Sequence, residues 1–407
     1  MNSTLSITQK SSLRGTASAL PASKSIANRV LIMKALAKSE SALHNLSDAN
    51  DTQLMLRLVN SPETEIDVED AGTTMRFLTA YFSITNQKKI LTGTARMKER
   101  PIGILVNALR SLGVDIAYLE KDGYPPIRIN GFSSQKTNAI SIRGDVSSQF
   151  ISALMMVAPV LPQGLTLTLE GKIGSRPYIE MTASLMRHFG TTAEFAGNTI
   201  SIKPQTYRAA EFTVESDWSG ASYWFSFVAL AKEADVVLPR LSLQSLQGDR
   251  AIADMTALGV KAELVNGELR LTKASGAKEI SWDFTHCPDL AQTVAVICAA
   301  KGIKGNFTGL ESLRIKETDR IAALQNELRK IGADLREDDS THWTLLPSTK
   351  LPSSASFQTY KDHRMAMAFA PLATLMNVEI ENPSVVRKSY PRFWDDVRSF
   401  GFQIEVR

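Results

Sequence analysis

Along the chain, apolar residues recur at helix-type spacing, end at a glycine, and are followed by short stretches of strand-type alternation. The predicted helix ends are residues 108–113, 186–190, 255–259, 327–332 and 397–401. The predicted strands are residues 114–119 and 126–129, 192–195 and 199–202, 261–265 and 268–272, 334–337 and 342–346, and 402–406. The glycines that end these helices lie 77, 69, 73 and 69 residues apart. Because a glycine after the last turn lets a helix end in the left-handed conformation, the pattern predicts a repeated helix–glycine–strand unit.

The regular spacing indicates a repeat architecture of about six units of about 70 residues. Residues 54–60, followed by 65–69, form a shorter first copy, in which Asn60 is expected to take the left-handed conformation. Six units are too many for one compact core, so we expect two domains of three units each. The junction is expected near residues 217–220, although no linker composition marks it.

Composition is that of an ordinary globular protein, with 407 residues, 43% apolar residues, 22% charged residues and a net charge of +4. The longest apolar stretch, residues 150–161, is shorter than the roughly 20 residues of a membrane span. Residues 1–10 show no targeting pattern. Cys287 and Cys298 lack metal-site or redox spacing, so we expect buried thiols inside a helix and a reducing, cytoplasmic location.

Basic residues stand repeatedly at predicted helix starts, where the positive end of the helix dipole disfavours them. Five starts show this: Ser23-Lys24-Ser25 with Arg29 one turn on, Gly72 to Arg76, Ser175-Arg176-Pro177, Lys316 to Arg320, and Asp362-His363-Arg364. The Ser147-Ser148-Gln149 start adds hydroxyl and amide donors. Free backbone N–H groups at a helix start bind anions. A single case indicates only a capped helix beside a solvated cation, but five together favour a small substrate with several negative charges.

Two other classes of protein explain the sequence less well. A nucleic-acid-binding module would need clustered Lys and Arg with aromatic platforms, whereas here the basic residues are isolated and tens of residues apart. A P-loop kinase would need the G-x-x-x-x-G-K-[ST] pattern, which the sequence lacks. We therefore expect small-molecule substrates, with neither nucleic acid nor a membrane as partner.

Several of these segments resemble the motifs of the 5-enolpyruvylshikimate-3-phosphate synthase family. In the first half they are Leu20 to Ser25 with Asn28-Arg29, Ala71 to Arg76, Arg96 to Gly103, Val146 to Phe150, and Ser175 to Tyr178. In the second half they are Pro288-Asp289, Arg314 to Arg320, and Asp362 to Met367. The motifs are in family order and span roughly residues 20–391.

The resemblance implies an inside-out α/β barrel of two domains. Each domain has three βαβαββ units, with helix N-termini facing the interdomain cleft. It also implies an N-terminal lobe of residues 20–217 that binds mainly shikimate 3-phosphate. Residues 1–19 and 218–407 would form a C-terminal lobe that supplies phosphoenolpyruvate-binding and acid/base residues. We expect a monomer without metal or cofactor.

The implied reaction transfers the enolpyruvyl group of phosphoenolpyruvate to the 5-hydroxyl of shikimate 3-phosphate through a tetrahedral ketal, with release of phosphate. By the resemblance, the contacts to shikimate 3-phosphate are Lys24, Ser25, Arg29, Ser147, Ser148, Gln149, Ser175, Tyr178, Asp289, Ser312 and Lys316. Those to phosphoenolpyruvate are Lys24, Gly72, Arg100, Gln149, Arg320, Arg364 and Lys388. The implied catalytic residues are Asp289 as base toward the hydroxyl, Glu317 as acid and base at C3, and Lys24 at the leaving phosphate.

Three positions depart from the frequent family pattern. Asp70 stands where Asn is common beside the phosphoenolpyruvate site, Ser312 where Asn often contacts shikimate 3-phosphate, and Phe77 where Pro is frequent. UDP-N-acetylglucosamine enolpyruvyl transferase shares the implied fold and chemistry. It carries a reactive Cys in the loop equivalent to residues 96–103, and this chain has none there.

Overall fold

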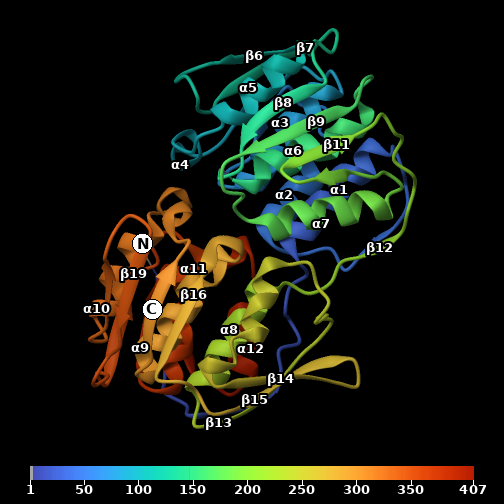
Figure 1. Ribbon diagram of the computed structural model, residues 1–407. Coiled ribbons are helices and arrows are strands. Elements are labelled where there is room, and N and C mark those ends of the chain that lie inside the picture. Colours follow the sequence, from blue (N-terminus) through green and yellow to red (C-terminus); the bar gives the residue numbers. More distant parts are fainter. Residues whose placement is uncertain (1–2, 146) are drawn as a thin grey trace. The chain divides into compact units, whose positions relative to one another are not determined.

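The computed structural model describes residues 3–145 and 147–407 (Figure 1). The chain divides into two compact units. Unit 1 comprises the chain up to Ala22, Asp48–Asn50 and Glu215–Arg407, and unit 2 comprises Ser23–Ser47 and Asp51–Val214. Each unit is described below by itself.

One sheet pattern is repeated within unit 2. Strand β4 (Glu65–Asp67) pairs in parallel with β5 (Lys89–Thr92), and β5 pairs antiparallel with β7 (Ile127–Phe132), which pairs antiparallel with β6 (Val114–Tyr118). The second sheet repeats this order with β8 (Ala139–Arg143), β9 (Leu165–Glu170), β11 (Thr199–Ile202) and β10 (Glu194–Ala196). A third repeat keeps only its parallel pair, β12 (Phe212–Thr213) and β3 (Leu43–His44). Among the described residues, this repeat therefore lacks the antiparallel hairpin that completes the other two sheets.

Unit 1 contains three complete four-stranded sheets with the same order. The first has β2 (Ser12–Thr16), β13 (Glu233–Leu238), β15 (Glu268–Lys273) and β14 (Val260–Val265). The second has β16 (Glu279–Asp283), β17 (Lys304–Thr308), β19 (His342–Leu346) and β18 (Asp334–Glu337). The third has β20 (Ser354–Phe357), β21 (Asn377–Glu381), β1 (Thr4–Ile7) and β22 (Ile404–Val406). In the third sheet β1 takes the hairpin position, so both ends of the chain complete one repeat.

A buried helix precedes the second strand of every parallel pair. In unit 2 these inner helices are α1 (Lys24–Leu36), α3 (Gly72–Ile84) and α6 (Ser148–Val157). In unit 1 they are α8 (Trp218–Leu230), α9 (Ala291–Lys301) and α11 (His363–Phe369). Nearly every residue of α3, α8, α9 and α11 is buried, because neighbouring inner helices pack on one another and the sheets cover them (Figure 1). These helices therefore bury nearly all of their faces, and their residues are mainly apolar.

The second helix of each repeat is amphipathic or shortened. This set comprises α2 (Asn50–Leu58), α5 (Gly103–Leu112), α7 (Arg176–His188), α10 (Arg320–Arg329) and α12 (Phe393–Ser399), with 3-10 turns η2 (Gly248–Asp254) and η3 (Thr256–Leu258) in the remaining repeat. The other short elements are α4 (Ala95–Lys98), η1 (Ala158–Val160), η4 (Phe284–His286), η5 (Pro288–Leu290), η6 (Glu311–Ile315), η7 (Ala370–Thr374) and η8 (Pro383–Lys388).

The predicted helix–glycine–strand junctions are confirmed. Gly113, Gly190, Gly259, Gly332 and Gly401 all have positive φ, between 77° and 108°. The first copy was predicted wrongly in detail: Asn60 is not among the left-handed residues, and β4 is the first strand of the sheet that β5, β7 and β6 complete. The third copy ends in 3-10 turns instead of an α-helix. The predicted two-domain α/β fold is confirmed, with one repeat reduced to two strands.

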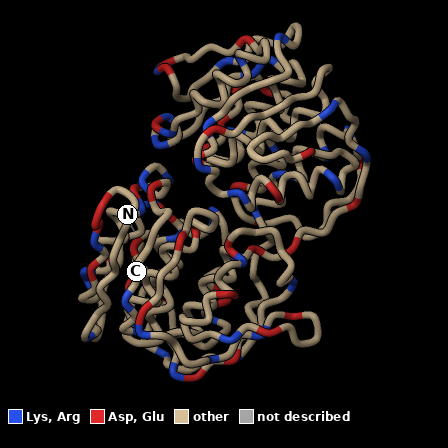
Figure 2. Tube along the Cα trace, viewed as in Figure 1, with Lys and Arg blue, Asp and Glu red and all other residues tan. Residues whose placement is uncertain are grey.

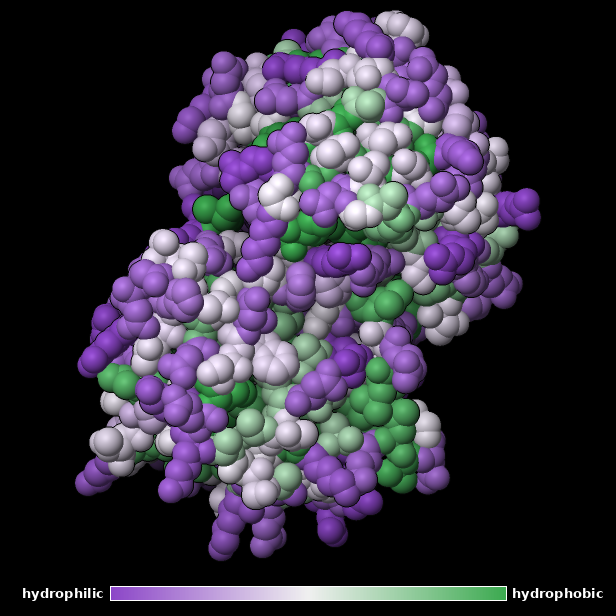
Figure 3. Space-filling model, viewed as in Figure 1, coloured by the Kyte–Doolittle hydropathy of each residue, from purple (hydrophilic) through white to green (hydrophobic). Residues whose placement is uncertain are grey.

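Both cysteines are buried, and burial raises the pKa of each thiol to about 12. Cys298 lies in α9 as predicted, whereas Cys287 lies between η4 and η5 and not inside a helix. Within the described ranges, no helix combines the length and apolarity needed to cross a membrane. Basic and acidic residues are interspersed along each unit (Figure 2), and the face in Figure 3 is mainly hydrophilic with scattered apolar patches.

Candidate active site

The N-terminus of α1 in unit 2 holds a lysine against a buried acid. Ser23 caps the helix by accepting a hydrogen bond from the backbone N–H of Ile26. The next residue, Lys24, points its Nζ at Oδ2 of Asp51, 2.9 Å away, and its side chain is 18% exposed. The sequence predicted this helix start and Lys24, but not Asp51 as its partner.

A glycine and an arginine meet at the start of α3. A Cβ placed on Gly72 would lie 2.6 Å from Nη2 of Arg100, so only glycine fits beside the guanidinium in its present position. Arg100 donates from Nη1 to the backbone oxygen of Asp70 at 3.3 Å. The side chain of Asp70 accepts a hydrogen bond from Thr94. Two predicted phosphoenolpyruvate contacts, Gly72 and Arg100, are therefore adjacent.

The start of α6 is tied to the start of α3. Nε2 of Gln149 donates to Oγ1 of Thr73 at 3.0 Å, while the backbone N–H of Gln149 donates to Oγ of Ser147 at 3.4 Å. Ser148 is buried at the first helical position and Ser147 is exposed. Val146, which belongs to the same motif, lies outside the described residues. The amide and hydroxyl donors predicted at the start of α6 therefore lie next to the start of α3.

Arg29 is buried in the core of unit 2 among α1, α6 and α7. Its guanidinium donates to Oγ1 of Thr182 at 2.7 Å, to the carbonyl of Ser25 at 2.8 Å and to Oγ of Ser152 at 3.0 Å, and it lies over the ring of Tyr178. Burial lowers the pKa of Arg29 to about 10, and Tyr178 opposes that effect. Arg29 therefore positions Ser25 and Tyr178.

The start of α7 adds two partly exposed side chains to unit 2. Ser175 has a φ of 52° at the residue before α7. Tyr178 is partly exposed in the first turn of the helix. Both are predicted shikimate 3-phosphate contacts on the same helix start.

In unit 1, one guanidinium is enclosed by three carboxylates. Arg320 begins α10 and is only 2% exposed. Its Nε lies 2.7 Å from Oδ2 of Asp362, its Nη1 2.9 Å from Oδ1 of Asp289, and its Nη2 2.8 Å from Oε2 of Glu317. Lys388 in η8 reaches the other oxygen of Glu317 at 3.1 Å. The predicted catalytic acids and two predicted phosphoenolpyruvate ligands therefore form one network.

Asp289 joins this network to α11. Its Oδ2 lies 2.7 Å from Nη2 of Arg364. Arg364 is the second residue of α11, and Asp362 is the N-cap of that helix. Burial favours the neutral form of Asp289, but the positive charges of Arg364, Arg320 and Lys316 together outweigh burial and hold its pKa well below its ordinary value. In the absence of substrate, Asp289 is accordingly a carboxylate committed to two arginines.

The structure places Glu317 and Ser312 differently from what the sequence predicted. Glu317 lies before Asp319, the N-cap of α10, so it is not a first-turn acid and the helix dipole does not explain its presence. Ser312 is exposed in η6, and none of its described contacts joins it to the carboxylate network.

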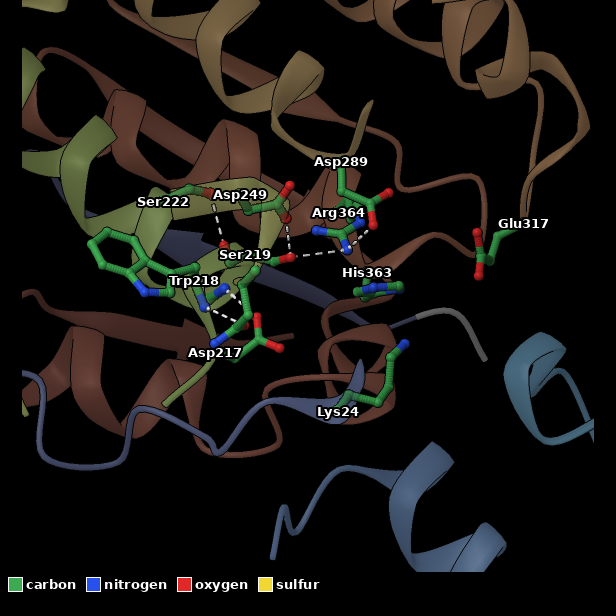
Figure 4. Close-up of polar contacts among 12 residues, drawn as sticks. Lys24, Asp217, Trp218, Ser219, Ser222, Asp249, Asp289, Glu317, His363 and Arg364 are labelled. Atoms are coloured by element: carbon green, nitrogen blue, oxygen red, sulfur yellow. Dashed lines mark hydrogen bonds and ion pairs between the residues drawn. The ribbon is translucent and has the colours of Figure 1, made fainter. Parts of the chain in front are cut away.

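Sequence reasoning missed a second layer of polar residues around Arg364. Nη1 of Arg364 donates to the hydroxyl of Tyr223 at 3.2 Å, and Nη2 donates to Oγ of Ser219 at 3.4 Å. Ser219 in turn donates to Oδ2 of Asp249 (Figure 4). The segment around residue 217 was interpreted only as a domain junction. The repeat contained the missing signal, because Asp217 caps an inner helix as Ser23 and Asp362 do.

Two α/β units with cations, hydroxyls and helix N-termini gathered in each define a protein that handles small polyanionic substrates. The sequence model of EPSP synthase (3-phosphoshikimate 1-carboxyvinyltransferase) matches residues 7–62 and 57–397. The chain belongs to the EPSP synthase family, which confirms the predicted resemblance, and it is a transferase.

Individual relatives agree with this assignment. The chain is 48% identical over 393 residues to the 3-phosphoshikimate 1-carboxyvinyltransferase of Bacteroides fragilis, with 95% of each protein covered. It is 36% identical over 407 residues to that of Photobacterium profundum, with 92% of this chain and 94% of the relative covered. The solved EPSP synthase of Acinetobacter baumannii has the same fold, with a TM-score of 0.80 at 20% identity over 100% of both chains. The family match favours this assignment over the UDP-N-acetylglucosamine enolpyruvyl transferase and nucleic-acid-binding alternatives.

Proposed function

We propose that this chain transfers the enolpyruvyl group of phosphoenolpyruvate to the 5-hydroxyl of shikimate 3-phosphate and releases phosphate, a step of aromatic amino-acid biosynthesis. The observation that best supports the proposal is the network in which Arg320 contacts Asp289, Glu317 and Asp362 at once. It combines acid/base groups with an anion-binding guanidinium in one buried cluster, as the transfer requires.

The two substrates are assigned sets of residues that overlap at Lys24 and Gln149. Phosphoenolpyruvate is proposed to contact Lys24, Gly72, Arg100, Gln149, Arg320, Arg364 and Lys388. Shikimate 3-phosphate is proposed to contact Lys24, Ser25, Ser147, Ser148, Gln149, Ser175, Tyr178, Asp289 and Lys316, with Arg29 acting through Ser25 and Tyr178. The exposure of Ser312 makes it the weakest member of the predicted set. Residues 20–217 would bind mainly shikimate 3-phosphate, and the remainder would supply the acid/base chemistry.

The low pKa of Asp289 requires that substrate binding activate it as a base. Anionic substrate groups compete with Asp289 for Arg320 and Arg364, whose charges keep its pKa low. When those charges are shared with a substrate, the pKa of Asp289 rises and the carboxylate becomes able to accept the proton of the attacking hydroxyl. The hydroxyl oxygen then bonds to C2 of phosphoenolpyruvate.

We propose that Glu317 becomes protonated when the substrate anions take up Lys388 and Arg320. Protonated Glu317 then gives its proton to C3 as the tetrahedral ketal forms, and the resulting carboxylate takes a proton back from C3 as phosphate leaves. Lys388 and Arg320 hold its two oxygens at 3.1 and 2.8 Å, so its carboxyl group is fixed in orientation. Lys24 would stabilise the departing phosphate, exchanging the carboxylate of Asp51 for the phosphate oxygens.

The direct test is phosphate release from phosphoenolpyruvate by the purified chain, measured with shikimate 3-phosphate, with UDP-N-acetylglucosamine, and with no acceptor. Release that depends on shikimate 3-phosphate alone is expected. Release only with UDP-N-acetylglucosamine, or none with either acceptor, would refute the proposed function.

We further propose that the protein acts as a monomer in the cytoplasm and without a metal or cofactor. Light scattering should give one chain, and the rate should be unaffected by dialysis against a chelator. A mass of two chains would refute the proposed oligomeric state.

A further inference from the structure

Asp249 is a buried carboxyl group to which the proposed reaction assigns no role. It lies in η2 and is 2% exposed. Its Oδ2 accepts a hydrogen bond from Ser219, whereas among the described residues its buried Oδ1 has no hydrogen-bond partner. A buried carboxylate oxygen without a donor is costly, so this site favours the protonated carboxyl group.

Ser219 connects this acid to the proposed phosphoenolpyruvate ligand Arg364. Figure 4 shows Ser219 between Asp249 and Arg364, with Asp289 on the far side of the guanidinium. Nη2 of Arg364 lies 3.4 Å from Oγ of Ser219 and 2.7 Å from Oδ2 of Asp289. A change at Asp249 therefore reaches Arg364 through one hydroxyl group.

The charges that face Asp249 come from several elements. The groups that act on Asp249 are Asp217 at the start of α8, Cys287 before η5, Asp289 in η5 and Arg364 on α11. Strand β14, which packs against η2, carries Lys261 and Glu263, and η2 itself carries Arg250 and Asp254. Lys261 pairs with Glu263, and Arg250 with Asp254, so these four side chains are already neutralised in pairs. Burial first and Asp289 second raise the pKa of Asp249 to about 7, against the opposing effect of Arg364.

We propose that Asp249 takes up a proton when Arg364 binds the anionic substrate, and that it positions Arg364 through Ser219. An anion at Arg364 cancels the positive charge that favours ionised Asp249, and it adds negative charge nearby. The proton is therefore held more tightly in the bound state, and by linkage the anion binds more tightly when Asp249 is protonated. Asp249 is thus a positioning residue, and its negative charge, when ionised, weakens the binding of phosphoenolpyruvate. This inference rests on the proposed role of Arg364.

The first test measures proton uptake by calorimetry. Phosphoenolpyruvate is titrated into the protein at pH 7.5 in buffers of different ionisation enthalpy, and the buffer dependence of the heat gives the protons bound per ligand. The wild type should take up about 0.3 to 0.6 proton more than Asp249→Asn, because a group of pKa near 7 is partly ionised at this pH. Equal uptake in both proteins would overturn the proposal.

The second test follows KM for phosphoenolpyruvate from pH 6.5 to 8.5. The ratio of wild-type KM to that of Asp249→Asn should rise about tenfold over this range, while the kcat ratio changes much less. Asp254→Asn is the matched control, since Asp254 lies in the same turn but is exposed and paired with Arg250. Asp254→Asn should follow the wild-type pH profile. A constant KM ratio for Asp249→Asn would overturn the inference.

Ser219→Ala tests the connection itself and remains informative if Asp249→Asn does not fold. It should raise KM for phosphoenolpyruvate about tenfold, with a smaller effect on kcat, because Arg364 loses its link to Asp249. An unchanged KM would overturn the positioning role. A wild type that binds phosphoenolpyruvate with proton uptake but releases no phosphate would refute the proposed function and leave the proton linkage intact.

Discussion

The two units use the same repeat but surround their cations differently. In unit 1, Arg320 alone contacts three carboxylates, and Arg364 and Lys388 share two of the same acids. In unit 2, Lys24 contacts the carboxylate of Asp51, and the neighbouring helix starts offer amide and hydroxyl donors such as Gln149 and Ser148. The repeat provides the helix N-termini, and the side chains at those termini decide the chemistry.

This difference has a consequence for how an anion binds to each unit. In unit 1 we propose that a substrate anion competes with Asp289 and Glu317 for the guanidinium and ammonium groups, so that binding changes the charge state of the acids. In unit 2 an anion mainly adds to donors that are aligned with helix dipoles. We therefore propose that the acids of unit 1 transfer the protons and that the donors of unit 2 mainly hold the substrate.

The largest expected effect comes from removing the acids of unit 1. Asp289→Asn and Glu317→Gln should each lower kcat by about 10²- to 10⁴-fold, because each removes a general acid/base group. Binding of shikimate 3-phosphate, measured by calorimetry, should persist in both variants. Glu337→Gln is the control, because Glu337 is an exposed partner of Arg314. Near-wild-type turnover in either variant would exclude that residue from its proposed role.

Removing the central cation of each unit should affect stability unequally. Arg320→Met leaves the buried Asp362 and the partly buried Asp289 and Glu317 without their shared partner and should cost about 3–5 kcal/mol of stability. Lys24→Met leaves the carboxylate of Asp51 without its lysine at a partly exposed site and should cost about 1–2 kcal/mol. Thermal unfolding midpoints at pH 7.5 measure both, with Arg314→Met as an exposed reference. Equal losses for Arg320→Met and Lys24→Met would show that the two units pair their charges alike.

Much of this architecture was predictable from sequence because it depends on local rules. Glycines at a regular spacing mark helix ends, and Ser23, Ser147 and Asp362 mark helix starts, so the repeat and the positions of Lys24 and Arg364 follow from short segments. The reduced repeat was harder to predict, because its two strands, β3 and β12, are only two residues each and far apart in the chain.

The partners of the predicted residues could not be found from sequence. Asp51 lies 27 residues from Lys24, and Asp249 lies 30 residues from Ser219. Such pairs form because the fold brings distant helix starts together. A local sequence pattern does not predict which helix starts will meet. The same limit applies to the low pKa of Asp289, which depends on Arg364 and on Lys316 and Arg320 of a second segment.

Asp249 should make the stability of unit 1 depend on pH. Below pH 3.8, the ordinary pKa, both folded and unfolded states hold the proton. Between pH 3.8 and about 7 the unfolded chain loses the proton while the folded protein keeps it, so stability falls as pH rises and then levels off. Asp249→Asn cannot ionise and should gain about 2–4 kcal/mol over the wild type at pH 8 but little at pH 4. Unfolding midpoints that differ equally at both pH values would contradict this.

The smallest effect is expected at the close approach of Gly72 and Arg100. The methyl group of Gly72→Ala would lie 2.6 Å from Nη2 of Arg100, which is the end of a flexible side chain, so the arginine should move and the helix should tolerate the change. KM for phosphoenolpyruvate should rise about tenfold with a smaller change in kcat, since one anion contact is displaced. The unfolding midpoint should stay near that of the wild type, because alanine favours the helix.

Gly174→Ala is the matched control for this prediction. Its added methyl group would meet nothing closer than 3.8 Å, and its backbone is not left-handed. If Gly174→Ala raised KM as much as Gly72→Ala, the effect would be a general response of unit 2 to added bulk. A rise confined to Gly72→Ala, and absent when Arg100→Ala is the background, would show that the methyl group acts through the arginine. That result would support the proposed role of unit 2. Its donors would bind the anion in the positions they already hold, and moving Arg100 would weaken binding without stopping the chemistry.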